Sequence, residues 1–147
     1  MHKNYLTDEE FYTIYGRVPR LNVDLIIRSN EGVLFSQRAI EPIKGFWHLP
    51  GGTVYKTEKI EEAAVRIAKK ETNLDVKVLG CLGYMEFLSE MRNGVEIHSI
   101  SIVMEVEAVR GEAKPDEHAT AVKYFMVLPE PVSKEHGVFL TEKGIFK

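Results

Sequence analysis

The chain has 147 residues and is 44% hydrophobic, which suffices for the core of one globular domain spanning residues 1–147. Its net charge of −3 comes from interspersed groups of both signs, which excludes a basic face for nucleic acid. The single cysteine, Cys81, excludes an internal disulfide, and no Cys/His metal cluster is visible. We find neither a signal peptide nor an apolar run of membrane-spanning length, so we expect a cytoplasmic protein without a membrane partner.

The N-terminal third is predicted to form a short helix followed by a β-hairpin. Residues 5–16 read as a helix in which Thr7 and Glu10 have the spacing of a capping box. Apolar alternation then indicates strands at 21–27 and 33–38, with turn-forming residues between them. The hairpin leads through a loop and a short strand toward the middle of the chain.

The middle of the chain is predicted to be a glycine-rich loop followed by a helix at 59–71. Gly51 and Gly52 come directly after an apolar run, as in a loop that leaves a strand. Thr57 is expected to cap the helix, and Asn73 occupies the position of a left-handed stop residue. One buried stripe has the three- and four-residue spacing of a helix: Ile60, Ala63, Ala64, Ile67 and Ala68.

Glu71 is the unusual residue of this helix, because it lies one turn beyond Ile67 on the inward face. A carboxylate there needs a cation or hydrogen-bond donors, and an ion pair at the helix end would satisfy it equally well. Glu58, Glu62 and Arg66 are spaced four apart, so we expect a ladder of charges along another side of the helix.

The last third is predicted to contain a long hairpin and a final strand. Extended segments at 76–88 and about 95–109 flank Asn93-Gly94, the preferred two-residue hairpin pair. A last strand is expected at 122–127, and a short helix from Thr141. One strong helix among hairpin-joined strands indicates an α/β fold with a mixed sheet.

The central stretch resembles the Nudix box, G-x5-E-x7-R-E-U-x-E-E-x-G-U, in which U is bulky and apolar. Gly52, Glu58 and Arg66 fall in register, and Glu71 matches the last glutamate. The run at 45–52 is similar to the G-x-W-x-x-P-G-G lead-in of the same family. The resemblance to the Nudix hydrolases implies an α/β/α sandwich around a central mixed β-sheet.

The chain departs from this box at three positions. Ile67 stands where the family has a metal-binding glutamate, Lys70 replaces another glutamate, and Asn73 replaces the glycine. The two apolar positions hold Ala68, which is small, and Leu74. The helix therefore retains a reduced set of the acids with which this family binds metal.

Within the family, the chain is similar to the GDP-mannose mannosyl hydrolases over roughly residues 5–125. The likeness rests on the run at 6–11, Pro19, Asp24, Arg38, Pro42, the glycine-rich lead-in and the run at 115–117. Those enzymes also have a helix short of the usual glutamates. The resemblance implies a homodimer that uses the N-terminal segment at 1–18.

The same resemblance implies one Mg²⁺ held by the Gly51 carbonyl, Glu71 and a side chain of the late loop. It also implies that Arg66 lies in or near the site, with Asp24 and Arg38. In the family the late loop continues with Gln-His, whereas this chain has His118-Ala119. His118 falls on the metal-ligand position without a gap and on the general-base position with a one-residue shift.

Two strand residues are candidates for substrate binding. Arg38 ends a strand that points toward the central loop, and an arginine binds phosphate bidentately without losing its charge. Asp24 lies mid-strand, opposite in direction to Val23 and Leu25. A buried aspartate must be paired, so Asp24 either anchors an arginine or accepts a ligand hydroxyl.

The histidines supply the candidates for a general base. His118 lies in a polar loop, where catalytic groups are common, and histidine is the usual side chain for a general base. His98 alternates with apolar residues on a strand, where it is either packed and hydrogen-bonded or in contact with a sugar. His48 is open to both interpretations, and His2 and His136 are expected at the surface.

These observations lead to three functional hypotheses. The leading one is an Mg²⁺-dependent hydrolase of a nucleoside diphosphate sugar such as GDP-mannose, with water attacking the sugar carbon, because a metal-bound diphosphate leaves without a protein acid. The second is a Nudix pyrophosphohydrolase that attacks phosphorus. The third is a nucleotide- or sugar-binding module without catalysis.

Overall fold

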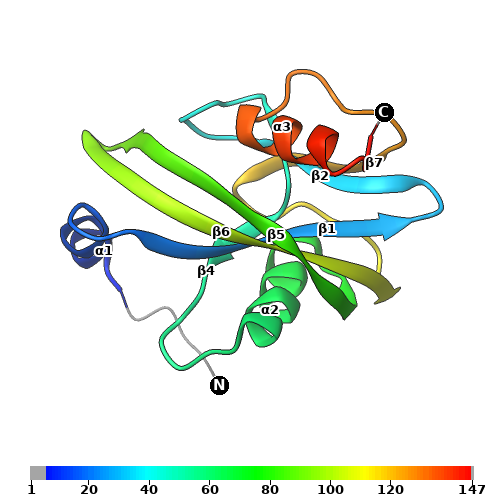
Figure 1. Ribbon diagram of the computed structural model, residues 1–147, viewed down its shortest axis with the longest axis horizontal. Coiled ribbons are helices and arrows are strands. Elements are labelled where there is room, and N and C mark those ends of the chain that lie inside the picture. The colour runs from blue at the N-terminus through cyan, green and yellow to red at the C-terminus, as the bar shows by residue number, and fades with distance from the viewer. Residues whose placement is uncertain (1–5, 147) are drawn as a thin grey trace.

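A mixed seven-stranded β-sheet lies between helices in the computed structural model, which describes residues 6–146 (Figure 1). Helix α2 covers one side of the sheet and α3 the other, while α1 lies beside one end of β6 (Figure 1). This is the α/β/α sandwich expected from the sequence. The elements are α1 Asp8–Tyr15, β1 Arg20–Ser29, β2 Gly32–Arg38, β3 Trp47–His48, β4 Gly51–Thr53, α2 Ile60–Thr72, β5 Asp75–Arg92, β6 Val95–Arg110, β7 Ala119–Phe125 and α3 Lys134–Glu142.

In the strand order β3-β2-β1-β6-β5, strand β1 lies in the middle of the sheet, between β2 and β6, and β4 also pairs with it. Strand β6 runs parallel to β1, whereas β4 and β2 pair with β1 in the antiparallel direction. A parallel pair needs a long crossover, and α2 lies within it. The pairing of Asp24 with Gly51 places the start of β4 against the middle of β1, and the loop toward α2 begins beside Leu21, near the start of β1.

Two apolar cores form on the two faces of the sheet, because successive β1 side chains point in opposite directions. Val23, Leu25 and Ile27 pack against the apolar stripe of α2. Ile26 faces α3 and packs with Phe139. The same alternation directs Asn22 and Asp24 to the α3 face, where both are buried.

Several predicted features of local structure are confirmed. Thr7 and Glu10 form the capping box of α1. Asn73 ends α2 in the left-handed conformation, with a φ of 66°. Asn93 and Gly94 both have positive φ and join β5 to β6, as a two-residue hairpin turn requires. Residue 5, the first of the helix predicted at 5–16, lies outside the described residues.

The predicted start of α2 is wrong. The N-cap is Lys59, and Thr57 precedes the helix with a φ of 66°. Glu58 therefore lies outside the helix, where it is buried with 9% exposure. The chain turns sharply before α2, and the four-residue periodicity of a helix does not extend to Thr57 or Glu58.

The C-terminal elements also differ from the prediction. Strand β7 begins at Ala119 rather than at the predicted residue 122. Its backbone already pairs with β2 at Ala119, opposite Arg38, and this pairing does not depend on apolar alternation. Helix α3 begins at Lys134 rather than near Thr141. Its interior Gly137 is unfavourable for a helix, but an added Cβ would lie 3.1 Å from Val132, so close packing explains the glycine.

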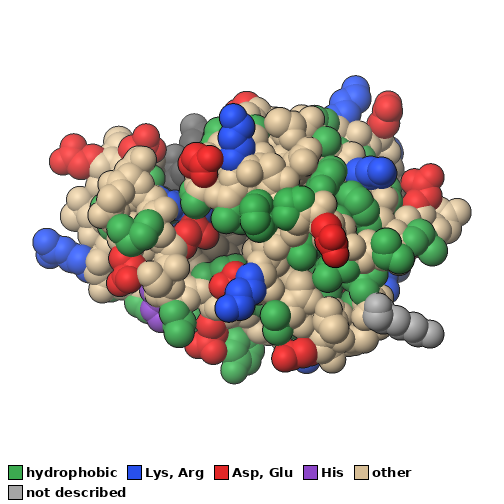
Figure 2. Space-filling model, turned by 90° about the horizontal axis from the view of Figure 1, so that it is seen from above, with side chains coloured by type: hydrophobic (Ala, Val, Ile, Leu, Met, Phe, Trp, Pro, Cys, Tyr) green, Lys and Arg blue, Asp and Glu red, His purple; other side chains and the backbone are tan. Residues whose placement is uncertain are grey.

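The surface carries charges of both signs, and Figure 2 shows them interspersed with apolar side chains over one face. Among residues 6–146, no helix combines the length and the apolar character needed to cross a bilayer. Helix α1 has no buried residue, and its Ile14 is 40% exposed.

Replacing Ile67 with alanine should destabilise the protein, because Ile67 is 2% exposed within the α2 core. We expect the free energy of unfolding to fall by about 2–4 kcal/mol, measured by urea denaturation. Val65→Ala is the matched control on the same helix, since Val65 is 43% exposed, and should change it by less than about 0.5 kcal/mol. Equal effects of the two substitutions would contradict the burial of Ile67.

Candidate active site

A cavity of about 340 Å³ lies where β1, β4, the second half of α2, the loop before β7 and the start of α3 meet. Its lining is rich in ionisable side chains of both signs. These are Arg20, Arg38, Arg66, Lys70 and Arg92, the acids Asp24, Glu71, Glu90 and Asp116, and the imidazoles of His48, His118 and His136. Gly51 and Gly52 form part of the wall. The cavity thus contains every predicted site residue except His98.

Glu71 reaches this cavity from the last turn of α2. The Gly51 N–H donates to Glu71 Oε1 at 3.1 Å, which fixes the carboxylate beside the start of β4. Burial raises the pKa of Glu71 to about 7, and the Gly51 hydrogen bond only partly opposes this rise. Glycine is required at 51, because an added Cβ would lie 1.8 Å from Asp24 Oδ1.

Asp116 is a second acid of the cavity, and it was absent from the predicted site. Its side chain is 8% exposed, and Oδ2 has no hydrogen-bond partner among the described residues. The negative charge of Asp116 contributes to the raised pKa of Glu71. Its position in the predicted late loop, beside His118, was the sequence signal that could have identified it.

His118 lies at the exposed side of the same loop. Its side chain is 54% exposed, with Nδ1 at 4.0 Å from Asp116 Oδ2 and 3.8 Å from Glu117 Oε1. The donor atoms of these three residues all lie within 4.8 Å of one another. Mg²⁺ prefers oxygen ligands and typically takes one or two carboxylates. The orphaned Asp116 oxygen and the buried Glu71 carboxylate are donors of this kind, so the residues present fit the ion.

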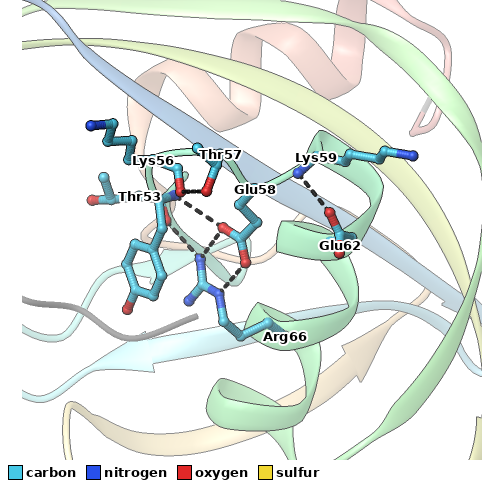
Figure 3. A network of polar contacts seen from close by, with 8 residues as sticks. Thr53, Lys56, Thr57, Glu58, Lys59, Glu62 and Arg66 are labelled. Atoms are coloured by element: carbon cyan, nitrogen blue, oxygen red, sulfur yellow. Dashed lines mark hydrogen bonds and ion pairs between the residues drawn. The ribbon is translucent and has the colours of Figure 1, made fainter. Parts of the chain in front are cut away.

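Arg66 connects α2 to the loop that precedes it (Figure 3). Its Nε donates to Glu58 Oε2 at 2.7 Å, and Nη2 donates to Glu58 Oε1 and to the Thr53 carbonyl. The guanidinium also lies over the Tyr55 ring, 3.8 Å from its centroid. Arg66 therefore holds β4 and the following loop against the helix, beside the cavity.

The predicted charge ladder along α2 is wrong. Arg66 pairs with Glu58, eight residues away, whereas Glu62 accepts a hydrogen bond from the Lys59 N–H at the N-cap (Figure 3). The ladder required Glu58 to lie on the helix. Because Glu58 lies in the loop, its carboxylate folds back toward Arg66 instead.

Asp24 is held by neutral hydrogen-bonding groups and a histidine. Asp24 Oδ2 accepts a hydrogen bond from Ser101 Oγ at 2.5 Å, and His136 Nε2 lies 3.5 Å from the same oxygen. Of the two predicted alternatives, anchoring an arginine is not what the structure describes. Asp24 Oδ1 packs against Gly51, so this aspartate supports the backbone beside Glu71.

His136 was expected at the surface, but it is 5% exposed. The Leu49 N–H donates to His136 Nδ1 at 3.1 Å, so Nδ1 is the acceptor of the ring and Nε2 is the nitrogen that faces Asp24. His136 thus joins α3 to the strand region just before Gly51. Only the packing of α3 on the sheet buries this residue, and no local sequence pattern indicates it.

His48 lies beside His136, with ring centroids 6.4 Å apart. Burial, followed by the neighbouring His136, lowers the pKa of His48 to about 4. His48 is therefore neutral at physiological pH, and its Nδ1 lies 2.8 Å from the Leu49 carbonyl, a distance at which a protonated Nδ1 donates.

Arg38 is positioned by backbone carbonyls near the rim of the cavity. Its Nε donates to the Pro42 carbonyl at 2.5 Å, and Nη2 to that of Glu41 at 3.3 Å. Burial lowers the pKa of Arg38, with a further contribution from Arg92. An arginine that is oriented in this way suits phosphate binding.

His98 lies apart from the other predicted site residues. The adjacent Ser99 lines the cavity, and strand alternation directs the two side chains to opposite faces of the sheet. His98 Nε2 is buried without a hydrogen-bond partner among the described residues. The structure therefore separates His98 from the site that contains Glu71.

Comparison with known proteins shows the family. A model of the NUDIX domain matches residues 18–141. The chain is 33% identical over 123 residues to the low-salt glycan biosynthesis protein Agl8 of Haloferax volcanii, covering 82% of this chain and 79% of that protein. It is 37% identical over 118 residues to an ADP-ribose pyrophosphatase of Methanocaldococcus jannaschii, covering 80% and 68%.

Solved structures agree with this match. The crystal structure of a MutT NUDIX hydrolase from Burkholderia pseudomallei superposes with a TM-score of 0.75 and 26% identity, covering 84% of this chain and 97% of that one. The sequence match, the sandwich and the glycine-linked glutamate together lead to one conclusion: this chain belongs to the Nudix family.

Proposed function

We propose that this Nudix protein is an Mg²⁺-dependent hydrolase of a nucleoside diphosphate sugar, with GDP-mannose as the first substrate to test. The observation that carries the proposal is the pairing of one helix acid, Glu71, with one loop acid, Asp116, in a cavity that also exposes arginines. Ile67 contributes to the core instead of adding a carboxylate. Two acids suffice for one metal on a diphosphate. The Haloferax relative's name, which refers to glycan biosynthesis, agrees with a sugar substrate.

Glu71 and Asp116 would hold the ion, with the Gly51 carbonyl as a further ligand. When bound, Mg²⁺ neutralises the diphosphate and makes it a good leaving group. Arg38 adds a guanidinium that can donate to phosphate oxygens. Arg66 acts indirectly, because it keeps the loop after β4 against α2.

His118 is our candidate general base. With Asp116 assigned to the metal, the ring of His118 is available for proton transfer. Its Nδ1 faces the carboxylates of Asp116 and Glu117, which leaves Nε2 to accept a proton from water on the far side of the sugar. Attack at the anomeric carbon would then invert its configuration.

A second candidate function is hydrolysis at phosphorus. The Methanocaldococcus relative is called an ADP-ribose pyrophosphatase, and a metal between two carboxylates also suits a pyrophosphate.

We further propose that the chain forms one domain and works as a homodimer through its N-terminal segment, because α1 leaves its apolar Ile14 exposed.

Hydrolysis of GDP-mannose in ¹⁸O-labelled water distinguishes these functions. We expect the label in the released sugar, because water attacks carbon, with GDP as the other product. Mass spectrometry of the sugar and phosphorus NMR of the nucleotide make the measurement. Label confined to phosphate would establish the second function, and tight binding without turnover at any Mg²⁺ concentration would contradict both.

Glu71→Gln should change the pH dependence of stability in metal-free protein. Folded Glu71 has a pKa of about 7 against an ordinary 4.5, so folding takes up a proton between these values. The contribution of Glu71 to the free energy of unfolding is therefore present at low pH and is lost as the pH rises toward 7. The loss should be on the order of 2 kcal/mol. Urea denaturation in EDTA should show this fall for the wild type and not for Glu71→Gln.

The exposed Glu61, on the same helix, provides the control: Glu61→Gln should keep the wild-type pH profile. Mg²⁺ should raise the melting temperature of the wild type more at pH 8 than at pH 6, because the metal competes with the proton. An equal Mg²⁺ effect on Glu71→Gln would remove this carboxylate from the metal site.

Asp116→Asn and His118→Ala should have separable kinetic effects. The first removes a metal ligand, so we expect a higher Mg²⁺ concentration for half-maximal rate. The second removes the base, so kcat should fall by roughly 10²–10⁴ with unchanged Mg²⁺ dependence. His98→Gln is the control, because His98 does not line the cavity. The reverse pattern would make His118 the ligand.

A further inference from the structure

Arg20, the first residue of β1, is a buried cation in the wall of the same cavity. It is 8% exposed, and its Nε donates to Ser99 Oγ at 3.2 Å. Within residues 6–146, that is its only side-chain hydrogen bond, and Glu90 and Asp24 act on its charge without hydrogen-bonding to it. Phe11 covers one face of the guanidinium, with 5.4 Å between its ring centroid and Cζ. The terminal nitrogens of Arg20 therefore remain available to a ligand.

Arg92 brings a second positive charge to this part of the cavity. It lies at the end of β5 and hydrogen-bonds to Glu90, which also lines the cavity. Burial and then the charge of Arg92 lower the pKa of Arg20 to about 10. The carboxylates of Glu90 and then Asp24 oppose this lowering, but neither hydrogen-bonds to the terminal nitrogens of Arg20 among residues 6–146. A buried guanidinium whose terminal N–H groups lack an acceptor is costly unless a ligand supplies one.

Asn22 supplies an unsatisfied acceptor next to these cations. It is 7% exposed and lines the cavity, and its Oδ1 has no hydrogen-bond partner among the described residues. Strand alternation places Arg20, Asn22 and Asp24 on one face of β1. Arg20 and Asp24 are four residues apart, or roughly 13 Å along the strand. Since Asp24 adjoins Gly51, this group lies at a distance from the proposed metal acids.

The ligand that satisfies all these atoms carries an anionic group and, beside it, a hydrogen-bond donor. A planar carboxylate accepts two parallel N–H bonds from an arginine, and a neighbouring sugar hydroxyl can donate to Asn22 Oδ1. A neutral hexose would leave the terminal nitrogens of Arg20 without an anionic acceptor. We propose that Arg20, Asn22 and Arg92 form a subsite for the carboxylate-bearing sugar of a nucleoside diphosphate hexuronic acid.

This inference rests on the proposed function and specifies its substrate class. The test compares GDP-mannose with GDP-mannuronate, which differ only at C6, where a hydroxymethyl group becomes a carboxylate. UDP-glucose and UDP-glucuronate form a second pair if another nucleobase is preferred. Dissociation constants are measured by calorimetry in EDTA, where the proposed function predicts no turnover.

We expect the wild type to bind the acidic member of the pair roughly tenfold or more tightly, as for a hydrogen bond to a charged group. Arg20→Gln should remove this preference and leave the affinity for GDP-mannose within about twofold. Asn22→Asp is nearly isosteric and is the second variant to use if Arg20→Gln does not fold. It should weaken binding of the acidic ligand selectively. Arg28→Gln is the control, because Arg28 on the same strand is exposed and pairs with Glu105.

Two results would overturn the subsite: equal affinity of the wild type for both members of the pair, or an equal loss for both in Arg20→Gln. The second would mean that Arg20 contacts the diphosphate shared by the two ligands. Turnover with Mg²⁺ is recorded separately. Lack of hydrolysis of every sugar nucleotide would remove the proposed function, while the ratio of dissociation constants still decides the subsite.

Discussion

The hydrogen bond from the Gly51 amide to Glu71 is the contact on which the candidate site depends. It joins the last turn of α2 to the start of β4. It also gives a buried carboxylate a hydrogen-bond donor that partly offsets the cost of desolvation. Both layers of the sandwich support it. Arg66 fastens the loop after β4 to the helix, while Asp24 and His136 hold the backbone next to Gly51 from the α3 side.

The cavity has two electrostatic ends, and this division follows from its construction. The acids Glu71 and Asp116 come from the helix end and the late loop, whereas Arg20 and Arg92 come from the far end of β1 and from β5. Burial raises the pKa of Glu71 and lowers that of Arg20, although Lys70 opposes the first shift and Glu90 and Asp24 oppose the second. A metal-bound diphosphate joined to an acidic sugar would satisfy both ends.

The sequence by itself determined the elements whose information is local. The apolar stripe of α2 and the left-handed stop at Asn73 depend on helical periodicity and on backbone preference. The Asn93-Gly94 pair sets its hairpin through positive φ angles alone. The spacing of Gly52, Glu58 and Arg66, together with the lead-in at 45–52, indicated the family, and the register placed Glu71 at its last glutamate, because these residues lie on one continuous loop–helix segment.

Only the tertiary structure decided which distant residues share the cavity. Asp116 enters it through the path of a loop, and only its place beside His118 in the predicted late loop pointed to it. His136 enters it through the docking of a weak helix and has no local signal. Glu58 turned out to pair with Arg66 because the chain bends before α2. His98 was excluded because each strand sends alternate side chains to opposite faces, and only pairing between strands decides which face borders the site.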